Sequence, residues 1–257
     1  MPLLRWVLLC CGLLPLQLQA CLLQMQAQHF PPRFIKQETE QGEVRWQGFN
    51  AELYHALARR LDCQAELLEI PWGRALQMLA EGELSMMSNA SWNEERAAFA
   101  HFIGPVSMER TLVVGPVALQ GKVTDLRQLT QVPGQISLMQ GVYYGSDFAR
   151  EVEQNPALQQ RLAYVSTSQQ KLELLLRGRV QLTFEDSLTL QQLYQQQVLD
   201  PHDFIALFTL HENPVYLLVS KAQFDPSQLA QLEAAWQQLV DDGTLAELKQ
   251  RYFDTSP

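Results

Sequence analysis

Between residues 22 and 87, short apolar runs alternate with amphipathic stretches. Leu53, Leu57 and Leu61 recur at helical spacing between the first two runs, which themselves have the length of strands. This β-α-β-α-β order predicts a parallel sheet with right-handed crossover connections. The predicted strands are 22–25, 65–70 and 84–87, and the second predicted helix is 75–79, ended by Gly82.

The rest of the chain continues this alternation. A helix ended by a glycine, an apolar strand and a polar loop follow one another at 169–186 in the same order as at 75–96. This similarity of layout, without a repeated sequence, predicts a second α/β unit. The further predicted strands are 111–117, 135–139, 163–165, 180–184 and 215–219, and the further predicted helices are a short one from Asp125, then 146–153, 169–177, 227–240 and 245–252.

A polar segment, 88–96, follows the apolar run that ends at Met87, and we expect it to be a loop. Ligands bind outside the carboxyl ends of strands in open α/β sheets. The guanidinium of Arg96, with Asn89 and Ser91 nearby, matches the geometry of a carboxylate. Alternatively, 94–96 is an ordinary first helical turn and Arg96 only caps a helix.

Residues 1–20 have the layout of a secretory signal peptide, with one basic residue, Arg5, before a short apolar run and a small residue, Ala20, before the expected cleavage site. The apolar run is too short to span a membrane. Cys21 raises lipid attachment as an alternative, but Gln19 stands where a lipobox has a small or β-branched residue. We therefore expect a soluble secreted protein, with anchoring at Cys21 as the alternative.

The acidic composition of the chain bears on which kinds of molecule it can bind. Loss of Arg5 with the signal leaves 18 basic residues of 19 against 28 acidic ones, a net charge of −10. This balance argues against nucleic acid and anionic lipid as partners. The sequence has no metal-ligand cluster, no Ser/His/Asp order and no phosphate loop, so we expect neither a metal nor a cofactor.

Two cysteines, Cys21 and Cys63, remain after signal cleavage, and they suggest a disulfide in an oxidising compartment. Each begins a predicted strand. If the two strands are parallel neighbours, both cysteines lie at the same edge of the sheet and a disulfide is geometrically natural. Lipid attachment at Cys21 would instead leave Cys63 without a partner.

In their order and spacing, a set of short segments resembles the bacterial extracellular solute-binding proteins of family 3, the polar amino-acid-binding type. The resemblance covers nearly the whole mature chain. No single segment is specific. The segments are Phe30-Pro31-Pro32, Gly48-Phe-Asn-Ala-Glu-Leu53, Gly82-Glu-Leu84, Asn93-Glu-Glu-Arg96, Phe102-Ile-Gly-Pro105, Gly178-Arg-Val180 and Asp242-Gly243-Thr244-Leu245.

The resemblance implies a two-lobed periplasmic binding protein fold of type II. Each lobe is a mainly parallel sheet flanked by helices, and two hinge strands join the lobes. Lobe 1 is expected over 21–107 and 214–257, and lobe 2 over 111–209. Hinge closure would trap the ligand between them. The expected protein is a periplasmic monomer that delivers its ligand to the permease of an ABC transporter.

The resemblance also implies a ligand site. Arg96 matches the arginine that pairs with a ligand α-carboxylate, and Asp186 matches the lobe 2 carboxylate that accepts the α-ammonium. Asp186 is at the same time a good helix N-cap. Trp72 stacks on the ligand or belongs to the core. The expected ligand-binding residues are Phe30, Trp72, Asn89, Ser91, Arg96, Tyr143 and Asp186.

The sequence departs from the family pattern beside Gly141. Val142 follows, where a threonine hydroxyl is usual, and two large aromatics, Tyr143 and Tyr144, come next. This favours a flatter, larger or less zwitterionic ligand, although an amino acid remains the first expectation. Two other functions stay open: an orphan sensory binding protein, and a cyclohexadienyl dehydratase-like enzyme with Glu173 or Glu185 as its acid. We expect no enzymatic activity and no catalytic residue.

Overall fold

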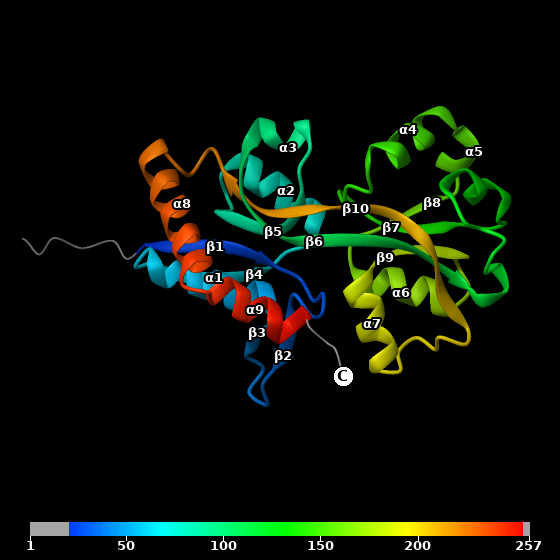
Figure 1. Cartoon of the computed structure of the whole chain (residues 1–257), viewed down its shortest axis with the longest axis horizontal. Coiled ribbons are helices and arrows are strands. Elements are labelled where there is room, and N and C mark those ends of the chain that lie inside the picture. The colour runs from blue at the N-terminus through cyan, green and yellow to red at the C-terminus, as the bar shows by residue number, and fades with distance from the viewer. Residues whose placement is uncertain (1–20, 254–257) are drawn as a thin grey trace, which may run out of the picture.

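One mixed sheet organises the molecule. The computed structural model describes residues 21–253, and its eight-stranded sheet has the order β4-β1-β5-β10-β6-β9-β7-β8. Two long antiparallel strands, β6 (Ala100–Pro116) and β10 (Phe204–Ser220), lie in the middle and run through both halves of the molecule (Figure 1). The predicted α/β class with mainly parallel strands on either side is confirmed.

The first half of the sheet is built on β1 (Leu22–Ala27), which pairs in parallel with β4 (Gln64–Glu69) and β5 (Met86–Ser91). A small hairpin of β2 (Ile35–Glu38) and β3 (Val44–Gln47) projects from it. The helices of this half are α1 (Phe49–Arg60), α2 (Trp72–Glu81), α3 (Glu94–Phe99), α8 (Pro226–Asp241) and α9 (Thr244–Phe253).

The second half is built on β7 (Ile136–Met139), which pairs in parallel with β8 (Leu162–Val165) and β9 (Leu182–Asp186). Two 3₁₀ segments precede it. The helical elements of this half are the 3₁₀ segments Val117–Leu119 and Leu126–Gln131, and the helices α4 (Ser146–Gln154), α5 (Pro156–Gln159), α6 (Ser168–Leu176) and α7 (Ser187–Gln195).

The structure corrects several predicted boundaries. The expected loop 88–96 is partly strand, because β5 continues to Ser91 and pairs with β10 through the backbone of Ala90 and Ser91. The predicted strands 111–117 and 215–219 correspond to the second parts of β6 and β10, and the first parts, 100–110 and 204–214, were not predicted. The β2–β3 hairpin and α5 were not predicted, and of α7 only the N-cap at Asp186 was expected.

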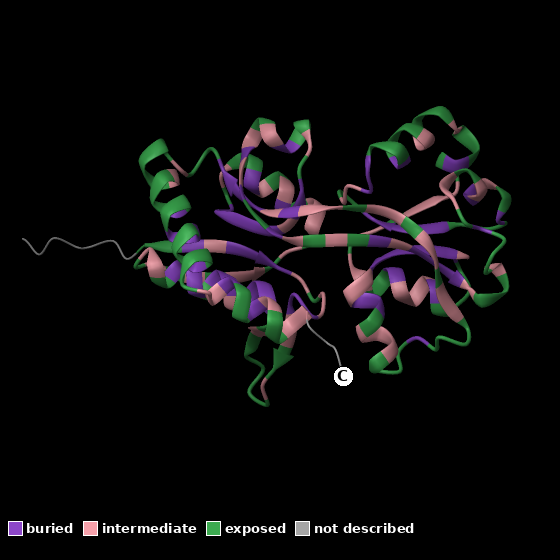
Figure 2. Cartoon of the chain, viewed as in Figure 1, coloured by how far each residue is buried: buried purple, intermediate pink, exposed green. Residues whose placement is uncertain are grey.

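The two halves have separate apolar cores, each made of two clusters of buried residues, and the buried positions gather in the strands of the sheet and in parts of the helices (Figure 2). Buried residues of one core lie in 23–106 and 217–248, whereas those of the other lie in 113–199. Within 21–253, no helix is long and apolar enough to cross a membrane. The strands β6 and β10 therefore connect two independently packed parts.

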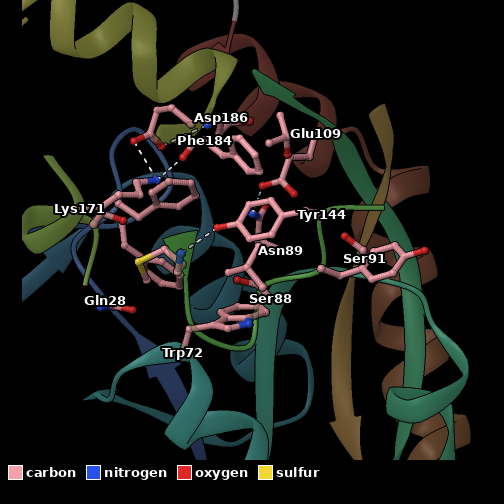
Figure 3. A pocket seen from close by; sticks show the side chains of 18 of the residues that line it. Gln28, Trp72, Ser88, Asn89, Ser91, Glu109, Tyr144, Lys171, Phe184 and Asp186 are labelled. Atoms are coloured by element: carbon pink, nitrogen blue, oxygen red, sulfur yellow. Dashed lines mark hydrogen bonds and ion pairs between the residues drawn. The ribbon is translucent and has the colours of Figure 1, made fainter. Parts of the chain in front are cut away.

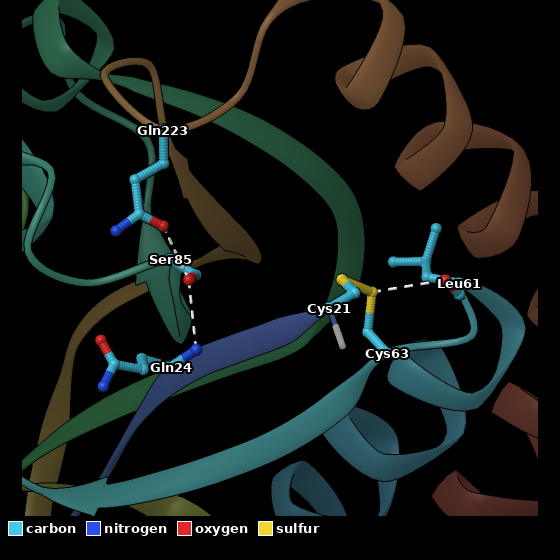
Figure 4. Close-up of a disulfide and its surroundings, with 6 residues drawn as sticks. All are labelled: Cys21, Gln24, Leu61, Cys63, Ser85 and Gln223. Atoms are coloured by element: carbon cyan, nitrogen blue, oxygen red, sulfur yellow. Dashed lines mark hydrogen bonds between the residues drawn. A yellow bond between two sulfur atoms is a disulfide. The ribbon is translucent and has the colours of Figure 1, made fainter. Parts of the chain in front are cut away.

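The predicted disulfide between Cys21 and Cys63 is present (Figure 4). The register of β1 and β4 pairs Leu22 with Gln64, which brings the preceding cysteines together with 4.5 Å between their Cα atoms. The parallel pairing assumed from the sequence is thus the physical reason for the bond. Residues 1–20, and with them the expected signal peptide, lie outside the described residues.

Candidate functional site

A polar cavity lies where the two halves of the sheet meet (Figure 3). It contains about 760 Å³ of space between the atoms, counting the solvent at its mouth. Strands β1, β5 and β6 contribute one wall, and β7, α6 and β9 contribute the other. All seven residues expected to bind a ligand line this cavity: Phe30, Trp72, Asn89, Ser91, Arg96, Tyr143 and Asp186. Their roles in binding stay predictions.

Arg96 brings a buried positive charge to the cavity wall. Its backbone N–H is capped by the Asn93 side chain at 2.8 Å, so Arg96 lies in the first turn of α3 as one alternative predicted. Its guanidinium donates to the carbonyls of Ser91, at 2.7 Å, and Gly141, at 2.9 Å, and lies 5.8 Å from the ring centroid of Trp72. Burial lowers the pKa of Arg96 to about 10, which leaves it charged at neutral pH. An arginine has five N–H donors, so further donors remain for a ligand.

The loop at Gly141 brings the second half of the molecule onto the first. The Gly141 carbonyl accepts a hydrogen bond from the Trp72 indole at 3.1 Å, in addition to the one from Arg96. Gly141 has a φ of 77°, and a Cβ there would lie 3.2 Å from the Cα of Gly73. A glycine is therefore required for this approach of the loop to α2.

The family resemblance implied that Asp186 accepts a ligand ammonium. In the structure this carboxylate already has a positively charged partner in the protein. Its Oδ1 lies 2.9 Å from Nη1 of Arg33, and the two side chains are 3% and 1% exposed. The same oxygen accepts the N–H groups of Leu188 and Thr189, so Asp186 is the N-cap of α7, as expected. A protein cation thus balances this carboxylate, which the family pattern gave no reason to expect.

Arg33 is the residue that sequence reasoning missed. It follows Pro31-Pro32 in a short loop, and a single arginine in such a loop normally faces solvent. Here the guanidinium is fully buried, with its carbon 5.6 Å from the Phe30 ring and 5.4 Å from the Phe253 ring. Only the docking of α9, more than two hundred residues away in the chain, supplies the second ring.

The backbone of Arg33 is held by the start of α1. Pro32 and Arg33 accept hydrogen bonds from the N–H groups of Phe49, at 3.1 Å, and Asn50, at 2.9 Å. Gly48, with a φ of 103°, permits this contact, because a Cβ there would lie 2.7 Å from both carbonyl oxygens. The Gly48-Phe-Asn segment noted in the sequence thus positions the buried arginine.

Asn89 connects Arg33 to a third charged group. The Asn89 Oδ1 accepts from Nε of Arg33 at 2.6 Å, and its Nδ2 donates to Oε1 of Glu109 at 2.8 Å. These two partners define the orientation of the amide, and Asn89 has a left-handed φ of 63° that asparagine tolerates better than most residues. The side chain of Asn89 thus orders two charged groups, and its expected contact with a ligand stays a prediction.

A second buried ion pair, between Lys171 of α6 and Glu185 of β9, lies on the opposite wall. The Lys171 Nζ is 3.0 Å from Glu185 and donates to the Phe184 carbonyl at 2.6 Å, and both side chains are about 95% buried, with 4% and 5% exposed. Glu185 also accepts the Asp186 N–H at 3.1 Å. Lys171 was not singled out from the sequence, because a lysine in a helix is usually on the surface.

Aromatic rings complete the cavity. Tyr144 belongs mainly to the core, since its ring packs edge-on against Phe184 at 5.3 Å and its hydroxyl accepts the Met139 N–H at 2.9 Å; burial raises its pKa. Tyr143 is half-buried and packs edge-on against His211. Of the two tyrosines that depart from the family pattern, Tyr143 is thus the one without a hydrogen bond from the described residues to its hydroxyl.

Among residues 21–253, no group of three histidine, cysteine or acidic side chains could hold a metal ion.

Two cores joined by two strands, with a polar cavity between them, define the class of two-lobed binding proteins. The chain belongs to the bacterial extracellular solute-binding proteins, family 3, whose sequence profile matches residues 24–255. This confirms the resemblance drawn from the sequence. A comparison with curated protein sequences finds no match.

Solved structures share the fold at low sequence identity. An ancestral arginine-binding protein bound to arginine is 17% identical with a TM-score of 0.76, and the match covers 90% of this chain and 98% of that one. An amino acid ABC transporter substrate-binding protein from Streptococcus pneumoniae, bound to L-arginine, is 16% identical with a TM-score of 0.72 over 91% and 93%. A histidine kinase sensor domain with similarity to periplasmic binding proteins is 15% identical with a TM-score of 0.71 over 92% and 96%.

Proposed function

We propose that this protein is a periplasmic solute-binding protein that traps a small polar ligand, an amino acid or a related compound, between two lobes. Lobe 1 comprises residues 21–107 and 214–257, and lobe 2 comprises 111–209. The hinges lie between them, in β6 and β10. The observation that carries the proposal is the cavity between the two halves of the sheet, whose walls come from both lobes.

Contacts across the cleft support closure as the trapping step. Gln28 donates to the Ser166 carbonyl at 3.0 Å, and the Thr189 hydroxyl donates to the Pro31 carbonyl at 2.8 Å. The buried ion pair of Asp186 crosses the cleft as well. Rotation about the hinge strands would separate these groups, and closure would remove water from the cavity. Polar contacts to the ligand become stronger in such an environment of lower dielectric constant.

The ligand contacts follow from the chemistry of the walls. Arg96, supported by Ser91, would bind a carboxylate group, for which a charged guanidinium has the right planar geometry. Phe30 and Trp72 would enclose the apolar part of the ligand, and the Tyr143 hydroxyl would offer it a hydrogen bond. Asp186 would contribute to the lobe 2 wall.

Delivery to the permease of an ABC transporter is the role we propose for the loaded protein. The disulfide supports a soluble periplasmic form, because a sulfur bonded to Cys63 is not available to carry a lipid on Cys21. The likeness to a histidine kinase sensor domain supports sensing as a second candidate. A pull-down with solubilised membranes separates the two, since transport requires capture of a permease and sensing requires capture of a receptor.

We propose that the protein binds its ligand without catalysing a reaction, and the positions of Glu173 and Glu185 support this. Glu173 lies on the surface of α6, where it accepts a hydrogen bond from Gln169 at 3.1 Å and stands 3.8 Å from Arg177. Glu185 lines the cavity, but Lys171 compensates its charge. The proposal therefore assigns neither of these two acids a role as proton donor to a substrate.

A thermal-shift screen of residues 21–257 against amino acids, amines, small carboxylates and short peptides tests the proposal. A ligand that binds only the folded protein raises the melting temperature by mass action. We expect a hit that Arg96→Ala abolishes. The exposed Arg127→Ala serves as the matched control. A screen without any hit would contradict the proposed function.

A further inference from the structure

The charged groups of the cavity do not all have protein partners. Asp186 is paired with Arg33 and Glu185 with Lys171, in both cases within 3.0 Å. Glu109 also lines the cavity, yet it forms no ion pair within 4.0 Å with any of residues 21–253. A carboxylate that is taken out of water without a cationic partner is unfavourable, unless a ligand supplies the positive charge.

Glu109 is held in place for such a contact. It lies on β6, at the crossing between the lobes, and faces the cavity near Asn89 (Figure 3). The Asn89 amide donates to one of its oxygens at 2.8 Å, and Arg33 in turn fixes the Asn89 amide at 2.6 Å. The second carboxylate oxygen has no hydrogen bond to residues 21–253, which leaves it to accept one from a ligand.

The positive charge of Arg96 complements Glu109 across the same cavity. Its guanidinium donates to two carbonyl oxygens and to no carboxylate of the described residues. The cavity therefore presents one cation and one anion that form no ion pair within 4.0 Å with any of residues 21–253. A small molecule with both an ammonium and a carboxylate group would satisfy both at once.

We infer that Glu109 is the residue that recognises the ammonium group of the ligand, with Arg96 recognising its carboxylate. The inference rests on the proposed binding function and deepens it. It moves the positive end of the ligand from the lobe 2 residue Asp186 to the crossing strand β6. Asp186 then acts with Arg33 as a closure contact between the lobes and not as the ammonium acceptor.

The electrostatics of the site support this assignment. The pKa of Glu109 is raised to about 7, first by burial and then by the negative charge of Asp186. The positive charges of Arg33 and Arg96, and the hydrogen bond from Asn89, oppose this rise only in part. An ammonium group would bring the pKa down again, so its binding must release a proton from the protonated fraction of Glu109.

Titration calorimetry on three variants tests the inference, with L-glutamine and L-arginine as ligands. We expect Glu109→Gln to raise the Kd of both about 10- to 100-fold, the value of a hydrogen bond to a charged group. Asp186→Asn keeps the helix cap but removes the closure contact with Arg33, so it should weaken the amino acids and their deaminated analogues by about the same factor. Glu212→Gln removes an exposed carboxylate that pairs with Arg110 outside the cavity, and it is the matched control.

The deaminated analogues, 4-carbamoylbutanoate and 5-guanidinopentanoate, provide the second comparison. They lack the ammonium group, so Glu109→Gln should leave their Kd within about threefold of the wild-type value. Titrations at pH 7 in phosphate and in Tris should show that wild type releases about half a proton per amino acid bound, whereas Glu109→Gln releases none from this site. Melting curves of each variant verify that it is folded.

The results separate the inference from the function beneath it. Amino acid binding that Asp186→Asn weakens and Glu109→Gln leaves unchanged would overturn the inference and keep the proposed function. Equal losses for the amino acids and their deaminated analogues in Glu109→Gln would also overturn it, because they would indicate a general disturbance of the cavity. A wild-type protein that binds no compound of the screen would overturn both.

Discussion

Replacing Arg33 with methionine should open the closed protein. The change removes the cation 2.9 Å from Asp186 and leaves a carboxylate that is 3% exposed. Removing one partner of a buried pair costs about 3–5 kcal/mol, and we expect about 3 kcal/mol here, because backbone N–H groups of α7 still stabilise the carboxylate. Opening the cleft returns Asp186 to water and relieves this cost. The ratio of closed to open protein should therefore fall roughly a hundredfold.

Small-angle scattering and a double-mutant cycle measure this effect. Arg33→Met should increase the radius of gyration, and saturating ligand should bring it back toward the wild-type value. In denaturant unfolding, Arg33→Met and Asp186→Asn together should cost less than the sum of the two, because the double variant has no unpaired buried charge. Arg110→Met, at an exposed ion pair, is the control. Unchanged scattering together with free energies additive within about 0.5 kcal/mol would refute the reasoning.

Three further predictions concern stability. Reducing the bond between Cys21 and Cys63, which are 42 residues apart, should lower the free energy of unfolding by about 3–4 kcal/mol in urea titrations; a change below about 1 kcal/mol would contradict the loop-entropy argument. Lys171→Met should cost about 3–5 kcal/mol by leaving Glu185 without its cation, and adding Glu185→Gln should recover part of that loss in melting curves. Glu109 has a pKa of about 7 when folded against an ordinary value of 4.5, so the folded state binds more protons between these values. Its contribution to the free energy of unfolding is therefore largest below pH 4.5 and is lost as the pH rises through 7, and Glu109→Gln should remove this part of the slope.

The gathering of the site residues could be predicted because the chain places them at the ends of strands. Ser91 ends β5 in one half of the sheet and Asp186 ends β9 in the other, and each of these strands has a parallel neighbour. The family resemblance implied that the two strand ends face the same cavity. The disulfide followed from the same reasoning, since Cys21 and Cys63 precede paired strands. The local sequence pattern was sufficient wherever the order and direction of the strands decide which residues meet.

The partners of the charged side chains could not be predicted in this way. Arg33 reaches Asp186 over 153 positions of the chain, and Glu109 contacts Asn89 on a strand whose polar residues resembled a loop. Nothing in the sequence around Arg33 or Lys171 distinguishes them from solvated residues, because their burial depends on rings and carbonyls from distant elements.

The alternation of apolar strands and amphipathic helices thus determined the α/β class and the disulfide, because these follow from periodicity and from strand order. The position of the cavity between two lobes was implied by the family resemblance. Only the tertiary structure decided which charges neutralise one another inside that cavity. Electrostatic pairing depends on distances of a few ångströms between groups far apart in the chain, and burial strengthens it in a way that no local pattern encodes. Asp186 has an ion-pair partner within 4.0 Å among the described residues and Glu109 does not. The proposed recognition of the ligand ammonium by Glu109 rests on this difference.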